Sequence, residues 1–284
     1  MNKSYKSYLF VPANQDKFID KAHLRSADIV VLDLEDSILQ ESKASARIGL
    51  LSAIDRLKDK KQKVAVRINN DLGNLAEDLK SIDYKKVDTI LYPKAESGDV
   101  ISFISEYVTE LESDQCADLH STSIVPMIET CKGVMNMQEV ANASSRVSAI
   151  ALGSEDLSCE LGVPPSTESL ISVCQKMALV AGEAGISALG FPGSIAEFSD
   201  IDKLKYLLTL SKNIGFNGAL CIHPAQVLEV NKVFTYSDEQ KDWAKRVVES
   251  MDAAIKDGKG ACKLDGKMID PPVVALARKI MDQV

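Results

Sequence analysis

Eight short apolar runs rich in β-forming residues recur along the chain up to residue 222, and longer amphipathic segments separate them. This alternation predicts βα units around a parallel sheet, and eight is the number of strands that closes a TIM barrel. An open, doubly wound sheet stays an alternative, because the seventh run is short and set in SALGFPGS. The runs are Tyr8–Val11, Ile29–Asp33, Val64–Ile68, Thr89–Tyr92, Ile124–Ile128, Ala149–Leu152, Ala188–Gly190 and Ala219–Ile222.

Three amphipathic helical segments follow the eighth run, which is more than a barrel requires. Their sequences are AQVLEVNKVF, SDEQKDWAKRVVESMDAAIKDG and GKMIDPPVVALARKIMDQV. We therefore predict an α/β fold with a (β/α)8-barrel catalytic domain at residues 1–224. Residues 225–284 are expected to form a C-terminal helical module that caps a neighbouring subunit.

Composition excludes several classes of protein. The 284 residues are 45% hydrophobic and 26% charged, which is ordinary for a globular chain and argues against disorder. The net charge of -8 argues against a nucleic-acid partner. The apolar run near the N-terminus is too short for a signal or a membrane span, so we expect a cytoplasmic protein. The six cysteines form no C-x-x-C pair and only three histidines occur, which leaves carboxylates and an oxygen-binding cation as the natural metal chemistry.

Polar residues follow six of the eight runs at the point where each strand should end. In a TIM barrel these positions meet at one mouth, where the active site lies. They include Glu35 and Asp36, which we assign to substrate binding, and His223. Asp36 or Ser154 alone would be read as a helix N-cap, but one Arg, one Lys and several carboxylates at one mouth indicate a metal site that binds an anion.

Glu129 and Asp156 end the fifth and sixth runs, so neighbouring strands should bring both carboxylates to one cation. Mg2+ is expected, because it takes one or two protein carboxylates and leaves positions for water and substrate. Arg67 lies within the third run, and its planar guanidinium suits a carboxylate or a developing enolate oxygen. A structural salt bridge from Arg67 to Asp33 or Glu35 is the competing interpretation.

The chain resembles the citrate lyase β-subunit, malyl-CoA lyase and citramalyl-CoA lyase group of the HpcH/HpaI aldolase superfamily. The resemblance rests on eight blocks in order from the first strand to the last helix: SYLFVPAN, VVLDLEDS, VAVRIN, YPKAE, PMIETCKGV, ALGSEDLS, GALCIHPAQV and DGKMIDPPVV. It implies a TIM barrel, Mg2+ on Glu129 and Asp156, and Arg67 on the substrate. It also implies a homotrimer or hexamer in which Asp270 enters the neighbour's site as a catalytic acid or base.

The same resemblance implies a set of contacts to the CoA part of a thioester substrate. Lys17 and Lys21 stand four residues apart on one face of a helix, as phosphate contacts or as ordinary surface lysines. For His223, a ligand contact and a packing role are both possible interpretations. Asp270 precedes Pro271, so it can also be interpreted as a helix N-cap. The positions that match CoA contacts are Phe10, Lys17, Lys21, Ile222 and His223.

Together these features predict a Mg2+-dependent carbon–carbon lyase acting on a citryl-, malyl- or citramalyl-CoA type of thioester. A thioester hydrolase at the same site, and a β subunit that works with an acyl carrier protein or a citrate lyase α subunit, are the alternatives. Two segments depart from the family pattern, residues 12–14 (Pro-Ala-Asn) and the stretch ALGFPGSI. They leave the acyl group and the thioester carrier open. A plain phosphate-binding barrel is disfavoured, because no G-x-G-x-x-G or P-loop motif is present.

Overall fold

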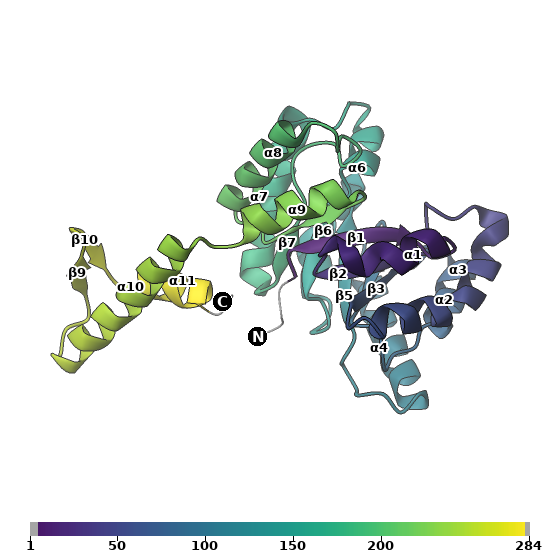
Figure 1. Ribbon diagram of the computed structural model, residues 1–284, viewed down its shortest axis with the longest axis horizontal. Coiled ribbons are helices and arrows are strands. Elements are labelled where there is room, and N and C mark those ends of the chain that lie inside the picture. The colour runs from purple at the N-terminus through teal and green to yellow at the C-terminus, as the bar shows by residue number, and fades with distance from the viewer. Residues whose placement is uncertain (1–4, 282–284) are drawn as a thin grey trace. The chain divides into compact units, whose positions relative to one another are not determined.

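Eight parallel strands, each joined to the next through helical segments, form a nearly closed barrel in the computed structural model, which describes residues 5–281 (Figure 1). The hydrogen-bonded order β7-β6-β5-β4-β3-β2-β1-β8 is completed by a single bridge between Leu189 and Gly218. The TIM-barrel prediction is confirmed. The strands are β1 Ser7–Pro12, β2 Ile29–Asp33, β3 Lys63–Arg67, β4 Thr89–Tyr92, β5 Ser123–Ile128, β6 Ala149–Leu152, β7 Ser187–Leu189 and β8 Ala219–Cys221.

Helices pack around the outside of this sheet. No helix in the described part of the chain is long and apolar enough to cross a bilayer. The α-helices of the barrel unit are α1 Asp16–Ala22, α2 Lys43–Lys58, α3 Leu72–Lys80, α4 Gly98–Asp114, α5 Cys131–Asn142, α6 Ser154–Leu161, α7 Thr167–Ala184, α8 Ile201–Ile214 and α9 Pro224–Phe234, with 3-10 turns η1 His23–Arg25 and η2 Gln40–Ser42.

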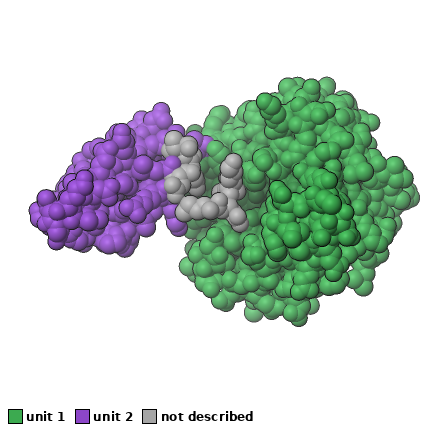
Figure 2. All heavy atoms as spheres, turned by 90° about the horizontal axis from the view of Figure 1, so that it is seen from below, with its two compact units in different colours: residues 1–234 green, residues 235–284 purple. Residues whose placement is uncertain are grey.

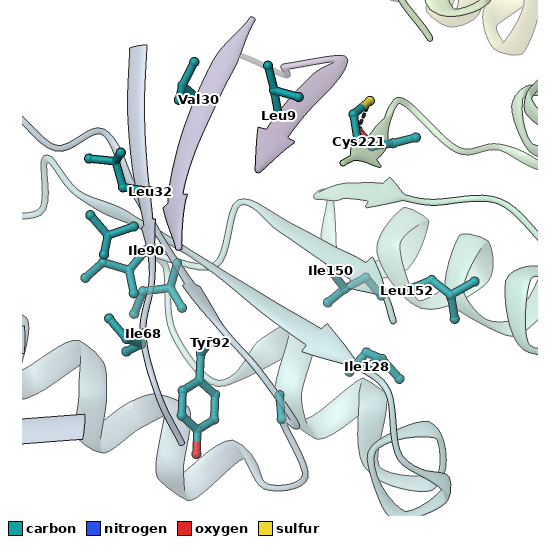
Figure 3. Packing of buried hydrophobic residues seen from close by; sticks show 14 of the residues in the cluster. Leu9, Val30, Leu32, Ile68, Ile90, Tyr92, Ile128, Ile150, Leu152 and Cys221 are labelled. Atoms are coloured by element: carbon teal, nitrogen blue, oxygen red, sulfur yellow. Dashed lines mark hydrogen bonds between the residues drawn. The ribbon is translucent and has the colours of Figure 1, made fainter. Parts of the chain in front are cut away.

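The strands are buried on both faces, as a parallel sheet covered by helices requires. Alternate residues of β2 therefore enter two different apolar clusters. Val30 and Leu32 pack between the sheet and the helices, and Figure 3 shows Val30 beside Leu9 of β1. Ile29 and Val31 pack with side chains inside the barrel. This period of two decides which residue at each strand end faces the mouth.

A buried ion pair between Glu112 and Arg146 lies toward the opposite end of the barrel, where the strands begin. The Glu112 carboxylate accepts hydrogen bonds from both terminal nitrogens of Arg146, at 2.9 and 2.6 Å, and from the N–H groups of His120 and Thr122. Both side chains of the pair are almost fully buried. The two ends of the barrel thus carry different polar groups, this ion pair at one end and the candidate site at the other.

Residues 235–284 form a second compact unit, shown in purple in Figure 2. Its elements are α10 Asp238–Lys256, the antiparallel hairpin β9 Cys262–Leu264 with β10 Lys267–Ile269, and α11 Pro271–Met281. The unit has an apolar cluster of its own, which includes Val247, Met251 and Val274. The helix α9 groups with the barrel unit, whereas the sequence boundary at residue 224 put it in the C-terminal module.

The hairpin was not expected from the sequence, which assigned the three tail segments to helices and no strand to residues 225–284. Asp265 and Gly266 join its strands with φ angles of 48° and 79°. Two left-handed residues are what a tight type I′ hairpin turn requires, and Asp-Gly is a preferred pair there. The Asp-Gly step was therefore the signal that would have revealed the hairpin.

Candidate functional site

A cavity of about 420 Å3 lies at the mouth of the barrel, among the carboxyl ends of the strands. The inward-facing series along each strand continues into it, so that Arg67 follows Ala65 and Glu129 follows Met127. Six residues assigned to the site from the sequence line this one cavity: Phe10, Asp36, Arg67, Glu129, Asp156 and Ile222.

Arg67 is held in place by Asp33. Its Nε and Nη2 atoms donate to the two Asp33 oxygens at 2.6 and 2.7 Å, and its guanidinium lies 4.8 Å from the centre of the Phe10 ring. Burial favours the neutral form of Asp33, but the Arg67 hydrogen bonds and charge outweigh it and keep the pKa of that carboxyl below its ordinary value. The expected salt bridge to Asp33 is therefore present. It fixes the guanidinium and leaves Nη1 facing the mouth, 2.9 Å from Glu35 and 3.3 Å from Asp36.

Glu35 is a buried carboxyl beside this arginine. Burial raises its pKa to about 8; the charge of Arg67 opposes that rise, while Asp36 and Glu129 add to it. Its Oε2 atom has no aligned hydrogen-bond donor among the described atoms, although Arg67 Nη1 lies 2.9 Å away. Glu35 is not in the described lining of the cavity. Its role in substrate binding stays a prediction.

Glu129 and Asp156 approach the cavity from the ends of β5 and β6. Glu129 is 3% exposed, and its Oε1 accepts the Lys94 N–H at 2.7 Å. Burial raises the pKa of Glu129 to about 7, with a further rise from Asp156 that the Lys94 N–H and two nearby cations oppose. Gly153 makes room for this side chain, because a Cβ there would lie 2.2 Å from Glu129 Oε2. Asp156 is more open, with 44% of its side chain exposed.

Lys94 lies between the carboxylates and was not assigned a role from the sequence. Its Nζ atom is 3.7 Å from Asp156 and 3.8 Å from Glu35. Its φ angle is 48°, in the left-handed region that a non-glycine residue seldom occupies. Backbone strain of this kind gathers at functional sites. Its place directly after β4, in YPKAE, was the available signal.

The chemistry of these groups fits Mg2+. Among residues 5–281, no group of three or more His, Cys, Asp or Glu side chains is arranged to hold a metal by itself. Mg2+ is commonly bound by one or two protein carboxylates with water and substrate oxygens, and Glu129 and Asp156 are of that chemical type. Their role as the metal ligands stays a prediction.

The loop after β7 forms a wall of the cavity through Phe191 and Ile195. Ser194 donates to Glu155 at 2.6 Å, and Gln226 of α9 donates to the Ile195 carbonyl at 2.8 Å. The loop is thus tied to the segments after β6 and β8.

The predicted residues Lys17, Lys21 and His223, like Glu35, are not in the described lining of the cavity. Lys17 and Lys21 of α1 are exposed. His223 stacks on Phe198 with ring centres 4.4 Å apart, and its Nδ1 accepts the Ala225 N–H, so the packing role is realised. A CoA contact of these three side chains stays a prediction.

Asp270 belongs to the C-terminal unit, where it precedes α11. Its Oδ1 accepts the N–H of Val273 at 3.3 Å, as the N-cap interpretation predicts. A catalytic role in a neighbouring subunit stays a prediction.

Comparisons with known proteins agree on one group. A protein-family model, HpcH/HpaI aldolase/citrate lyase, matches residues 6–224. The chain is 29% identical over 279 residues to citrate lyase subunit beta of Leuconostoc mesenteroides subsp. cremoris, covering 97% of this chain and 92% of that protein. It is also 29% identical over 300 residues to L-malyl-CoA/beta-methylmalyl-CoA lyase of Cereibacter sphaeroides, covering 97% and 93%. Among solved structures it is similar to protein CitE from Mycobacterium tuberculosis in complex with magnesium, acetoacetate and coenzyme A, with a TM-score of 0.75 and 27% identity over 100% and 99% of the two chains.

Proposed function

Because the chain belongs to the HpcH/HpaI aldolase/citrate lyase family, we propose that it is a Mg2+-dependent carbon–carbon lyase acting on a hydroxy-acyl thioester of the citryl-, malyl- or citramalyl-CoA type. The products are an oxo acid and an acetyl-type thioester. The observation that carries the proposal is the meeting of Arg67, Glu129 and Asp156 in one cavity at the barrel mouth.

The metal site consists of Glu129, which follows β5, and Asp156, which lies in the first turn of α6 after the neighbouring strand β6. When bound there, Mg2+ supplies a Lewis acid for the hydroxy or oxo oxygen and the adjacent carboxylate of the acyl group. Glu129 is oriented for this role by the Lys94 N–H, and Gly153 leaves its carboxylate the room it occupies.

Arg67 stabilises the negative charge that develops on the thioester oxygen as the carbon–carbon bond breaks. Asp33 fixes two of its nitrogens, so that Nη1 is presented to the cavity in a set direction. A donor held in place before the reaction stabilises developing charge most effectively, since it need not reorganise. Glu35 and Asp36 beside Nη1 contact the same end of the substrate.

Asp270 transfers the proton to or from the acetyl-type carbon, from the C-terminal unit of a neighbouring subunit. The active form is therefore an oligomer, a homotrimer or a hexamer. CoA is bound by Phe10, Lys17, Lys21, Ile222 and His223, with the two lysines on its phosphates.

Incubation of the purified chain with Mg2+ and malyl-CoA, citramalyl-CoA or citryl-CoA tests the proposal by mass analysis of the products. Cleavage to an oxo acid and a shortened thioester is expected for at least one of them. Release of the intact hydroxy acid with free CoA would identify a thioester hydrolase instead. If none of the three thioesters gives a product, and cleavage appears after addition of an acyl carrier protein and a citrate lyase α subunit, the chain is a carrier-dependent β subunit.

A further inference from the structure

Lys43 occupies a position that disfavours a lysine in two ways. It is the first residue of the 16-residue helix α2, where the partial positive charge of the helix N-terminus repels a cation. It is also buried, with 9% of the residue exposed, and removal of an ammonium group from water is costly unless it is fully paired. A residue that breaks local rules in this way is expected at a functional site.

The contacts of the ammonium group explain how Lys43 is accommodated. Its Nζ donates to the carbonyl oxygens of Leu34 and Glu35 at 3.2 and 3.1 Å, and to the side-chain oxygen of Asn69. An ammonium has three donors, and all three are used. Two of the acceptors are consecutive backbone carbonyls of the loop that follows β2.

Asn69 and Asp78 complete the network around the same loop. The Asn69 side-chain nitrogen donates to the Leu34 carbonyl at 3.0 Å and to Asp78 Oδ2 at 2.6 Å, and the Asn69 N–H also donates to Asp78 Oδ2. Asp78 is fully buried, and its other oxygen accepts from Arg47 at 2.8 Å. The Leu34 carbonyl is thus held from two directions.

We propose that Lys43 is a positioning residue that fixes the backbone of Leu34 and Glu35, and through it the Glu35 carboxylate beside Arg67. The inference rests on the proposed function, since it treats Arg67 and Glu35 as substrate-binding groups. The Glu35 N–H donates to Asp33, the carboxylate that holds Arg67, so the loop and the guanidinium share one support. Lys43 itself contacts backbone and Asn69, and acts only through them.

Lys43→Met tests this role, because methionine keeps the length of the side chain and removes its charge and donors. Lys58→Met is the matched control. Lys58 is the last residue of the same helix, and its ammonium pairs with Asp88 at 2.5 Å, near the start of β3. The same substitution thus removes a paired lysine from each end of α2.

Two measurements separate positioning from general stability. Hydrogen exchange at the amides of Glu35, Ser37 and Ile38 should accelerate by about ten-fold or more in Lys43→Met and stay within about two-fold of wild type in Lys58→Met. With the thioester that the wild type cleaves, kcat should fall about 10- to 100-fold in Lys43→Met, since small misplacements of substrate-orienting groups have effects of that size. Lys58→Met should retain its kcat at a temperature where both variants are folded.

Unchanged exchange in the loop, or an unchanged kcat, would overturn the positioning role. If Lys43→Met does not fold, Lys43→Gln, which keeps a neutral donor, is measured with the same two outcomes. If the wild type cleaves none of the thioesters, the proposed function fails by itself, and the exchange comparison still decides whether Lys43 holds the loop.

Discussion

A single methyl group added at Gly153 tests how closely the metal site depends on the packing of Glu129. Gly153 has φ −96° and ψ 87°, which other residues can adopt. The effect of Gly153→Ala is therefore steric and does not come from backbone strain. Its Cβ would lie 2.2 Å from Glu129 Oε2 and 2.3 Å from Glu129 Cβ. Rotation of the carboxylate cannot relieve the second clash, because Cβ is fixed to the backbone at the end of β5.

The ends of β5 and β6 must then separate by about 1 Å, which is the order of the overlap given by the 2.3 Å approach. Overpacking of this kind costs about 1–3 kcal/mol, which for a chain of this size corresponds to a decrease in melting temperature of about 2–12 °C. The shift also disturbs the 2.7 Å hydrogen bond from the Lys94 N–H to Glu129. Mg2+ affinity should fall about 10- to 100-fold, as it does when the support of a metal ligand is lost.

Thermal unfolding and calorimetric titration with Mg2+ measure the two effects. Gly182→Ala is the control: Gly182 lies inside α7, and its added Cβ would have no neighbour within 4 Å. That variant should gain about 0.5–1 kcal/mol from the better helix former and bind Mg2+ unchanged. If Gly153→Ala melts and binds Mg2+ like the wild type, the steric reasoning about Glu129 is wrong.

Three further outcomes are expected. Glu129→Ala and Asp156→Ala should each abolish Mg2+-dependent turnover while thermal unfolding shows a folded barrel; full turnover in both would remove them as metal ligands. Asp270→Asn should be inactive alone. Mixed with Glu129→Ala chains and given time to exchange subunits, it should regain partial activity. A mixture as inactive as its components would refute proton transfer from a neighbouring subunit. Glu112→Gln should lower the free energy of unfolding at pH 7 by about 3–5 kcal/mol, because Arg146 is left buried without its carboxylate. Burial favours the neutral carboxyl, but Arg146 and two N–H groups outweigh it and hold the pKa of Glu112 below its ordinary value. The stabilisation that the Glu112 carboxylate gives the wild type is therefore complete above about pH 4.3 and declines as the pH falls through the lowered pKa. In urea unfolding, the free energies of unfolding of the wild type and of Glu112→Gln should converge only in acid.

The barrel could be predicted from the sequence because its strands are buried on both faces and stand out as apolar runs. The runs predicted for β2, β4 and β6 have the observed bounds. The hairpin of β9 and β10 escaped because short half-exposed strands carry little apolar signal, and only the Asp265-Gly266 turn marked it. The grouping of α9 with the barrel depends on packing, which amphipathic periodicity does not reveal.

The gathering of Arg67, Glu129 and Asp156 followed from a single rule, that parallel strands end at a common mouth. The roles of Lys43 and Lys94 could not be predicted in the same way. In the sequence a lysine at the start of a helix, or after a strand, has the same signature as a solvated surface charge. The burial of Lys43 and the acceptors around it depend on a fold in which Leu34 and Glu35 come close to Asn69. The position of Lys94 beside Glu35 and Asp156 depends on the same meeting of strand ends.

The barrel closes between β7 and β8 through a single bridge, Leu189 to Gly218, and we call this place the seam. Elsewhere neighbouring strands pair through ladders. At the seam the pairing consists of the bridge and of two backbone hydrogen bonds of 2.9 Å, from the Gly190 N–H to the Gly218 carbonyl and from the Asn217 N–H to the Ala188 carbonyl. Side-chain contacts such as that of Gln226 with the Ile195 carbonyl add to it. We expect that side to open first under thermal or mechanical load, since sparse backbone pairing means low local stability. Substitutions there can reshape the wall around Phe191 while the ladders that carry Arg67 and Glu129 stay intact.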